Sequence, residues 1–438
     1  MRMLKVAVPL SESFRLGYLL RTVIAAALSA LVPIVAWPQE ALRNSLAGAE
    51  AAAAQARALE RQDYNLKIGN AKLLANAYLG LEYNDNIRYL DAQKQQDFIL
   101  HPQVNTSVTW PVTVRNVLSF SLGLGYTKYL DHSEFDYMVV TPGSQLAFDI
   151  FISDLKLTFY DRFSYYQDPG VEASVSGVAA YGGIENAAGL NVSWDLNQAI
   201  LTGGYAHTVF IPDQDIFDYL TRSSELFLIQ ASFLPNRTIS LGPEGTAALT
   251  HYDHSFLHDA VSYSAGVFVE GKLSQYIRAA MRAGYVAYDF DQNRFALVAQ
   301  NPKTYYFSVS AAHTVSQYIQ HTLSGGREVR LGTFADFQEQ FFARYTVNWN
   351  IFRQIGLATQ FSYEHGRYPA VALGTGGVTP VYVGGEEYNR IGGIVTVKYQ
   401  VMEKLTSTLT YRYWLKQSDV HSRDYTQNSI TVGLTYRF

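Results

Sequence analysis

The chain has 438 residues, of which 16% are charged and 14% aromatic, and it contains 32 Tyr, 24 Phe and no Cys, with a formal net charge of −4. The small net charge and the lack of a basic stripe argue against a nucleic-acid partner. The lack of Cys excludes a disulfide framework, a thiolate zinc site and a Cys nucleophile. The aromatic enrichment and a mean hydropathy near zero favour strands with one apolar and one wet face over membrane helices.

Residues 1–36 have the pattern of a secretory signal peptide. Four basic residues precede an apolar run from Thr22 to Ala36. This run is shorter than the roughly 20 residues that a membrane helix needs, and Pro33 interrupts it. We therefore expect cleavage after Ala36, with Ala49 as the second choice, and the alternative is an uncleaved membrane anchor.

Residues 37–70 are expected to form a short periplasmic extension. Its central part, 39–62, is Ala-rich and favours a helix, but it lacks a wide apolar face. From residue 71 to 438 the pattern changes to alternating segments of about 10 to 14 residues, which is the pattern of strands.

We count roughly eighteen alternating segments. The segments that begin near Ser223 and Thr238 alternate least clearly, and the second contains Pro243. The predicted strands begin near Leu74, Phe98, Asn116, Tyr137, Leu155, Ile184, Ala199, Ser223, Thr238, Val261, Tyr276, Thr304, Ile319, Glu339, Gln354, Asn389, Lys404 and Tyr425.

The connections between the segments are alternately short and long. Ser153-Asp154 is a short one, whereas 167–183 and 368–387 are long and rich in Gly, Pro, Asp or Asn. This alternation is typical of a transmembrane antiparallel up-and-down β-barrel, which has short periplasmic turns and longer outside loops. The two long loops are also the expected constrictions of the barrel lumen.

One face of each predicted strand is apolar. In the segment from Leu405, Leu409 and Tyr411 share a face, and Arg412 lies on the other. A Lys or Arg facing lipid costs about 2 to 4 kcal/mol, so charge should be excluded from the apolar face of a membrane barrel. A soluble β-sandwich would also alternate, but its strands are usually about half as long.

The tryptophans indicate an orientation for this barrel. Trp110, Trp194 and Trp349 each lie on the apolar face a few residues before a short turn. Amphipathic rings gather at membrane interfaces, so we expect these three to form an aromatic belt on the periplasmic side. Since unpaired backbone groups are costly in lipid, the last strand must pair with the first.

The C-terminal sequence TVGLTYRF resembles the C-terminal signal of bacterial outer-membrane barrels. Thr431, Gly433, Tyr436 and Phe438 fill the polar, glycine and two aromatic positions of that signal. The resemblance implies assembly by the barrel assembly machinery. It also implies a location in the bacterial outer membrane, in contact with its lipid and lipopolysaccharide.

Residues 79–110 resemble the opening hairpin of the β-barrel porin 2 family. Tyr83, Asn84, Asp85 and Asn86 stand where that family has a Tyr-Asp-Asp-Asn cluster, so the first acidic position is Asn here. The resemblance implies a link to exopolysaccharide production or export, with exopolysaccharide or its export components as partners.

The polar faces of the strands supply candidate pore-lining residues. Rings of basic residues in a pore favour anions, so the sequence predicts a porin-like channel for small polar, anionic or saccharide solutes. The alternative for these charges is that they pair across the wall. The basic candidates are Lys156, Arg162, Lys272, Arg278, Arg282, Arg330, Arg344, Lys398 and Arg412, and the acidic candidates are Glu82, Asp149, Asp195, Glu270, Glu328 and Glu364.

Two other functions are weighed against a channel. One is a non-conducting accessory barrel of a polysaccharide secretion system. The other is a barrel hydrolase, but no nucleophile motif lies beside His101, His207, His313 or His365. The stretch HYDHSFLHD, 251–259, has metal-ligand residue types without a standard zinc spacing. We expect no metal, no cofactor and no enzymatic activity.

Overall fold

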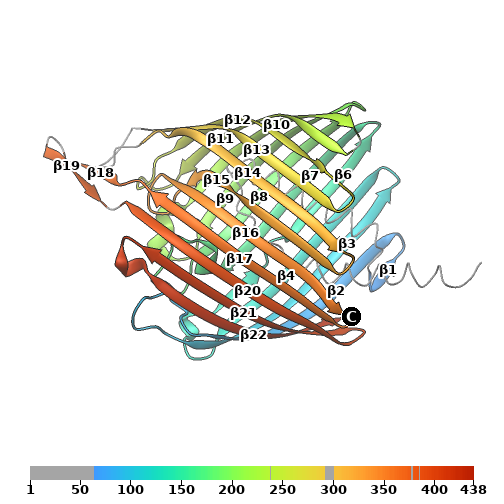
Figure 1. The fold of residues 1–438 in the computed structure, drawn as a ribbon, viewed down its shortest axis with the longest axis horizontal. Coiled ribbons are helices and arrows are strands. Elements are labelled where there is room, and N and C mark those ends of the chain that lie inside the picture. The colour runs from blue at the N-terminus through green and yellow to red at the C-terminus, as the bar shows by residue number, and fades with distance from the viewer. Residues whose placement is uncertain (1–63, 237, 292–299, 376–377, 384) are drawn as a thin grey trace, which may run out of the picture.

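The computed structural model describes residues 64–438 except 237, 292–299, 376–377 and 384. The predicted signal peptide and most of the predicted extension therefore lie outside the described residues. The described chain is almost entirely strand, and its strands form one large antiparallel sheet that closes on itself (Figure 1).

The closed barrel has 18 strands, which confirms the predicted fold class. One strand position is shared by two shorter strands, β5 (Tyr137–Val140) and β6 (Gln145–Ile152). The other strands of the wall are β2 (Ala71–Asn84), β3 (Asp97–Thr113), β4 (Asn116–Tyr129), β7 (Leu155–Gln167), β8 (Gly182–Asp195), β9 (Ala199–Pro212), β10 (Arg222–Asn236), β11 (Ile239–Tyr252), β12 (Ala260–Lys272), β13 (Ile277–Phe290), β14 (Lys303–Ser316), β15 (Ile319–Leu331), β16 (Phe337–Phe352), β17 (Ile355–Tyr368), β20 (Glu386–Met402), β21 (Leu405–Ser418) and β22 (Tyr425–Arg437).

The remaining elements are short. In the part of the chain that the structure describes, three strands lie outside the wall: β1 (Leu66–Ile68), which pairs with β2, and a separate hairpin of β18 (Val371–Thr375) and β19 (Val378–Val383). Four 3-10 helices lie in the loops: η1 (Ser133–Phe135), η2 (Pro169–Val171), η3 (Asp215–Leu220) and η4 (His421–Arg423). Within the described residues, no helix is long and apolar enough to cross a membrane.

The seam between β22 and β2 closes the barrel. The pairing runs from Asn76 opposite Arg437 to Asn84 opposite Ser429. Beyond the end of β22, the same edge of β2 pairs with β1, and the side chain of Asn65 bonds to the backbone N–H and C=O of Ala75. The first and last described strands therefore share one edge of β2.

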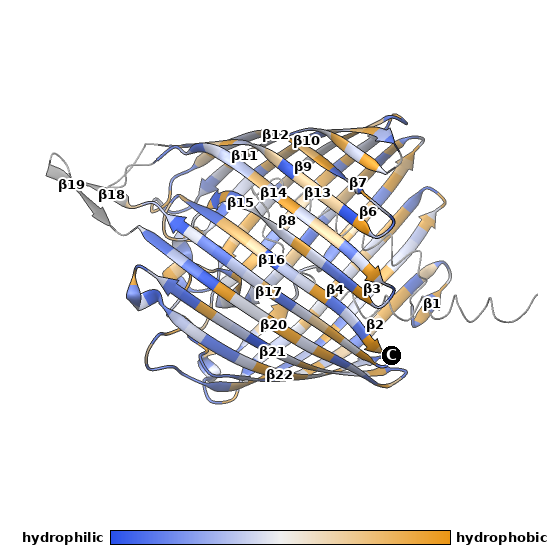
Figure 2. Cartoon of the chain, in the orientation of Figure 1, coloured by the Kyte–Doolittle hydropathy of each residue, from blue (hydrophilic) through white to orange (hydrophobic). Residues whose placement is uncertain are grey.

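Alternation of side chains explains why these sequences form the wall. Figure 2 shows orange and blue residues alternating along the strands. On β21 and β22, the outward Leu409, Tyr411 and Val432 are 42–53% exposed, although all three are apolar or aromatic. Large apolar side chains left exposed over the whole outer face require an apolar surrounding, which for a closed barrel is lipid.

The short turns have the backbone geometry that tight hairpins need. Ser153, between β6 and β7, and Asn197, between β8 and β9, have φ values of 51° and 68°. Positive φ at such positions is typical of two- and three-residue hairpin connections, and Asn tolerates it well. These turns lie at one end of the barrel, and the longer loops lie at the other (Figure 1).

Several aromatic rings on the inner face lie flat over glycines of the wall. Tyr388 covers Gly366, and Trp414 covers Gly392, so that a Cβ on either glycine would overlap the ring. Because glycine has no side chain, the ring can lie against the backbone of the wall, and a large ring then takes up little of the lumen.

Two of the irregularities of the wall lie at β5–β6 and in β11. Between β5 and β6, residues 141–144 bulge, and the hydroxyl of Thr141 lies over the inner face of Gly123 on β4. In β11, the ladder to β10 is broken between the Gln230–Glu244 and Phe233–Leu241 pairs, which flank Pro243. Proline lacks the N–H that a ladder needs, which accounts for the interruption.

Charge is not fully excluded from the outer face, contrary to the expectation from sequence. Arg327 on β15 shares the outward parity of the exposed Leu323, yet it is only 5% exposed. Its guanidinium carbon lies 4.3 Å from the ring centroid of Tyr305 and 5.7 Å from that of Phe341, and it forms an ion pair of 2.9 Å with Glu339. The two rings and the carboxylate cover the charge.

Candidate functional site

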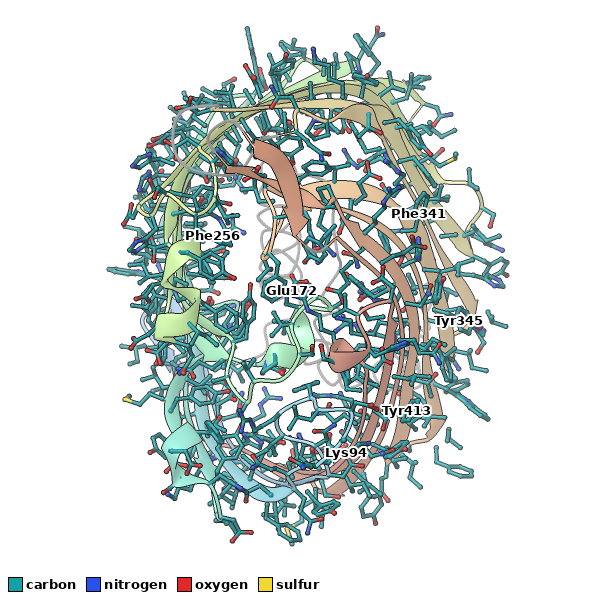
Figure 3. The ribbon with its side chains drawn as sticks, turned by 90° about the vertical axis from the view of Figure 1, so that its left-hand side faces the viewer. Lys94, Glu172, Phe256, Phe341, Tyr345 and Tyr413 are labelled. Carbon is teal, nitrogen blue, oxygen red and sulfur yellow. The ribbon has the colours of Figure 1, made fainter. Side chains whose placement is uncertain are left out.

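The loop between β7 and β8, residues 168–181, folds into the barrel. Figure 3, which views the barrel from the end with the long loops, shows Glu172 of this loop near the middle of the opening, whereas Phe341, Tyr345 and Tyr413 lie on the wall. The loop starts from one side of the wall and contacts strands on the opposite side. One of the two predicted constricting loops therefore occupies the lumen.

Three basic residues of the far wall hold this loop. Arg330 on β15 forms an ion pair of 2.9 Å with Glu172. Arg390 on β20 donates to the carbonyl of Gly170 at 2.9 Å, and Lys416 on β21 donates to the carbonyl of Ser174 at 3.2 Å. Since all three cations bind one short segment, the loop is fixed along the β15–β21 side of the lumen.

The local sequence favours this compact loop. Asp168 accepts a hydrogen bond from the N–H of Gly170 at 2.8 Å and so begins η2, where Pro169 already has a suitable backbone angle. Gly177 has a φ of +81°, a conformation that side chains disfavour, and it reverses the chain toward β8.

Two neighbouring loops support the inward loop. From loop 85–96, the hydroxyl of Tyr89 lies 3.4 Å from Asp168, and the carbonyl of Tyr89 accepts from the N–H of Gly177 at 3.2 Å. From η3, Phe217 and Leu220 pack with Val175 in one buried apolar cluster. The outside loops therefore form one connected layer across the lumen.

The charge of Glu172 is stabilised at the point of attachment. Burial alone would raise the pKa of this carboxyl, but the nearby Arg330 and the N–H and hydroxyl of Ser174 outweigh it and hold the pKa below its ordinary value. Glu172 is therefore ionised at neutral pH, and its ion pair with Arg330 links the loop to the wall.

The strand alternation places the predicted pore-lining residues on the inner face, but many of them are engaged in pairs. Lys156 and Asp149 form an ion pair of 3.1 Å, and Glu82 lies 3.2 Å from His101. Arg282 binds Glu244. The other contacts of the candidates are Arg282 with Glu270 at 3.6 Å, Arg330 with Glu172, and Glu364 with Arg390 at 2.6 Å.

The remaining candidates differ in exposure. Lys272, Arg278 and Asp195 are exposed near the short turns, whereas Arg344 and Glu328 are buried. The half-buried candidates are Arg162, Lys398 and Arg412. Their role as the lining of a conducting pore remains a prediction.

Sequence reasoning missed several charges that hold the lumen together. Arg390 and Lys416 lie on the same inner parity as the predicted Lys398 and Arg412, so the alternation could have identified both. Glu244 was hidden by the irregular segment around Pro243. Nothing in the sequence pattern indicates that Glu172 of a loop meets Arg330.

The second predicted constriction is wrong. The long connection 368–387 contains the β18–β19 hairpin, which projects beyond the loop end of the barrel instead of folding into it (Figure 1). Its strands pair with each other and form a sheet separate from the wall.

The residues predicted to contact the membrane lie on the outer face. Trp110, Trp194 and Trp349 are 41–48% exposed, at the short-turn ends of their strands. The four residues of the predicted assembly signal, Thr431, Gly433, Tyr436 and Phe438, lie along the strand that closes the barrel and at its end. The role of the three tryptophans as an aromatic belt and the role of the four C-terminal residues as an assembly signal remain predictions.

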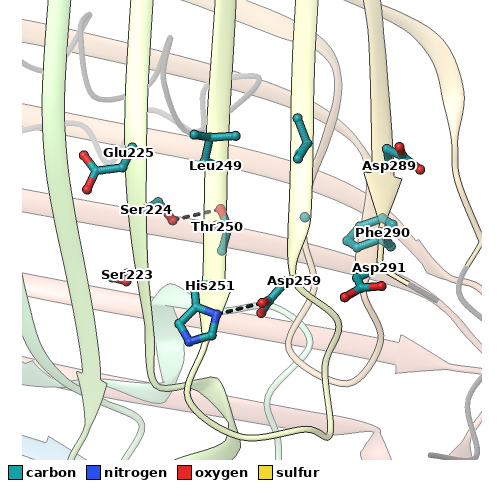
Figure 4. Close-up of a pocket in the computed structure, with 12 residues that line it drawn as sticks. Ser223, Ser224, Glu225, Leu249, Thr250, His251, Asp259, Asp289, Phe290 and Asp291 are labelled. Carbon is teal, nitrogen blue, oxygen red and sulfur yellow. Dashed lines mark hydrogen bonds and ion pairs between the residues drawn. The ribbon is translucent and has the colours of Figure 1, made fainter. Parts of the chain in front are cut away.

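The histidines are dispersed over the barrel. In HYDHSFLHD, His251 lies 2.7 Å from Asp259 across the mouth of a hairpin (Figure 4), and His258 contacts Asp336 of another loop at 2.9 Å. Within the described part of the chain, no group of three or more potential ligands could hold a metal ion. The four other histidines considered above lie on four different strands: His101 on β3, His207 on β9, His313 on β14 and His365 on β17.

No family model and no curated protein matches the chain. Among solved structures, it is similar to Pseudomonas aeruginosa OpdQ, with 9% identity over 85% of this chain and 100% of that one and a TM-score of 0.48. P. aeruginosa OccK2 (OpdF) in complex with glucuronate gives 9% identity, 85% and 99% coverage and a TM-score of 0.47. P. aeruginosa OpdK with vanillate gives 12% identity, 84% and 99% coverage and a TM-score of 0.46.

The location of the chain follows from its architecture. A closed barrel of 18 strands leaves no unpaired edge in hydrocarbon, and its outer face is apolar and exposed. The chain is a bacterial outer-membrane β-barrel.

Proposed function

We propose that the protein is a porin-like channel for small polar solutes. The observation that carries this proposal is the inward loop, which narrows an 18-strand lumen and is held in it by Arg330 and Arg390. A barrel of this width encloses more space than its own side chains fill, so a loop that folds into it constricts a lumen that is otherwise wide enough for solutes.

The inner face suits hydroxyl-rich solutes. It carries neutral polar side chains such as Asn76, Asn105 and Ser264, of which the first two are hydrogen-bonded to each other at 2.9 Å. Neutral donors and acceptors can exchange hydrogen bonds with a sugar without binding it tightly, which is what passage requires. Together with the basic residues near the constriction, they support passage of saccharides and small anions.

The link to exopolysaccharide production or export rests on the resemblance of residues 79–110 to the β-barrel porin 2 family. In this proposal, exopolysaccharide or its export components are partners, and the barrel assembly machinery inserts the chain among outer-membrane lipid and lipopolysaccharide. A non-conducting accessory barrel is the competing function, and the loop layer across the lumen is the observation that favours it.

Conductance of the refolded protein in planar lipid bilayers distinguishes the two functions. A channel gives stable single-channel currents, and in a salt gradient its reversal potential shows weak preference for the anion. A barrel that inserts but carries no current would be the accessory protein, and clear cation selectivity would contradict the anion preference.

A further inference from the structure

The buried Lys and Arg side chains of the described residues are paired with carboxylates, with one exception. A buried charge is costly unless an opposite charge accompanies it, because burial removes its hydration. Arg344 on β16 is buried and forms no ion pair within the part of the chain that the structure describes. The four others are paired: Arg282 with Glu244, Arg327 with Glu339, Arg390 with Glu364 and Lys416 with Glu386.

The guanidinium of Arg344 also lacks hydrogen-bond acceptors. Its side chain lies on the inner face of β16, opposite to the outward Tyr345 that Figure 3 labels on the wall, and the residue is 7% exposed. Among the described residues, neither Nε nor Nη1 of Arg344 has a hydrogen-bond partner. Buried N–H donors in native proteins are nearly always hydrogen-bonded, so these two indicate an acceptor that the described chain does not supply.

The carboxylates that act on Arg344 do not pair with it. Glu364 and Glu328 attract its charge, and Arg390 repels it. Oε2 of Glu364 accepts from Nε of Arg390 at 2.9 Å and lies 2.6 Å from its Nη2. Glu328 stands opposite Gln340, further along β16 toward the loop end. Arg344 therefore has a cation as a neighbour and no carboxylate in contact.

Hydroxyl groups flank Arg344 on both sides. Ser324 on β15 and Ser362 on β17 are its direct partners in the two ladders. Directly paired residues share a face, with Cβ atoms about 4.5 to 5.5 Å apart, so two hydroxyls and the guanidinium can reach one ion. The ring of Trp414 lies near the hydroxyl of Ser362, because a Cβ on Gly392 would overlap both. The donors thus lie at a wall position with an aromatic border.

These surroundings indicate an anion. Water could accept hydrogen bonds from Nε and Nη1, but it would leave the buried charge without a counterion. An anion supplies both the acceptor and the charge, and it reduces the repulsion between Arg344 and Arg390. The buried position favours a small inorganic ion over an organic carboxylate. We propose that Arg344, Ser324 and Ser362 form a binding site for an inorganic anion of the size of chloride; this site goes beyond the proposed channel function, because it does not depend on conduction.

Bromide is the first probe of the site, because its anomalous scattering locates it in a crystal. In crystals of the native protein grown from sodium bromide, we expect an anomalous peak within hydrogen-bond distance of the guanidinium of Arg344 and of at least one of the two hydroxyls. Bromide peaks at other positions only, or no peak at all, would overturn the site. This measurement needs neither a variant nor a current, so its outcome is separate from that of the channel proposal.

Chloride-dependent stability is the second test, in lipid vesicles. The urea midpoint of the native barrel should be higher in sodium chloride than in sodium gluconate of equal ionic strength, because an anion that binds only the folded state stabilises it. The variant R344M removes the charge but keeps a long side chain, so the difference between the two salts should disappear.

The control carries the same change of charge on the same face of the barrel. Arg278 on β13 lies on the inner face but is exposed near a short turn, so R278M should keep the native difference between the two salts. An R344M barrel that responds to chloride as strongly as the native one would overturn the site. If R344M does not fold, the bromide measurement on the native protein decides.

Discussion

The ring of Tyr388 lies against Gly366, its direct partner on the neighbouring strand, and belongs to the same buried cluster as Ala173 of the inward loop. A Cβ on Gly366 would lie 2.5 Å from Cε1 of the ring. The ammonium of Lys416, which donates to the carbonyl of Ser174 of the loop, lies 4.7 Å from the centroid of the same ring. Gly366 is therefore linked to the loop through the ring of Tyr388.

Replacement of Gly366 by Ala should disturb both the ring and the loop. The added methyl group displaces the ring of Tyr388 and so disturbs the cluster that it shares with Ala173, and overpacking of this kind costs about 1 to 3 kcal/mol. We expect a lower urea midpoint for the barrel folded in lipid vesicles and a changed single-channel conductance. Gly203 is the control, since a Cβ there meets nothing within 4 Å, and G203A should leave conductance unchanged.

The link between Glu172 and Arg330 should give the channel an acid-sensitive conductance. Because the pKa of Glu172 is lowered in the folded protein, its ionised form stabilises the loop at neutral pH, and this stabilisation is lost as the pH falls through the lowered pKa. Conductance should be constant from about pH 7 to about pH 5 and change only below about pH 4, since an ordinary Glu titrates near 4.3.

The variant E172Q serves as the reference for this acid response. It should show at neutral pH the conductance that the native protein reaches in acid, with more current noise and no further step on acidification. An identical acid step in E172Q would assign the response to another carboxyl group.

Arg327 should stabilise the barrel from its lipid-facing side. The variant R327A removes the stacking on Tyr305 and leaves Glu339 without its ion-pair partner, and we expect a loss of about 2 to 3 kcal/mol. Urea unfolding in lipid vesicles measures this. In the double variant with E339Q the loss should be smaller than the sum of the single losses, and strict additivity would show that the two side chains do not interact.

Deletion of Phe438 should affect assembly more than transport. The backbone N–H of Phe438 donates to the carbonyl of Ala75 at 3.3 Å at the end of the seam, whereas its side chain is 53% exposed and outside the lumen. We expect less protein in outer-membrane fractions of expressing cells, and nearly native conductance for the fraction that inserts. Normal membrane levels of the variant would contradict a role for Phe438 in assembly.

The wall was predictable because it obeys a local rule. Alternation over each strand, as in Leu409 and Tyr411 against Arg412, follows from the period of two and from the difference between lipid and water. Strand number, turn pattern and the seam followed from this rule together with the need to pair every backbone group in lipid.

The lumen was less predictable because its contacts join distant residues. Length alone made 167–183 and 368–387 equal candidates for a constriction, and only the three-dimensional contacts of Glu172 distinguish them. The same holds for Arg327, where alternation correctly assigns the outer face but does not show that Tyr305 and Glu339 cover the charge.

The short strand β1 has a consequence for the chain before it reaches the bilayer. β22 ends opposite Asn76, and without β1 the edge of β2 from Ala71 to Leu73 would present unpaired backbone groups at the short-turn rim. Open edges recruit strands from other molecules and lead to aggregation. By occupying that edge itself, the chain removes a site of self-association in the aqueous compartment that an outer-membrane protein must cross.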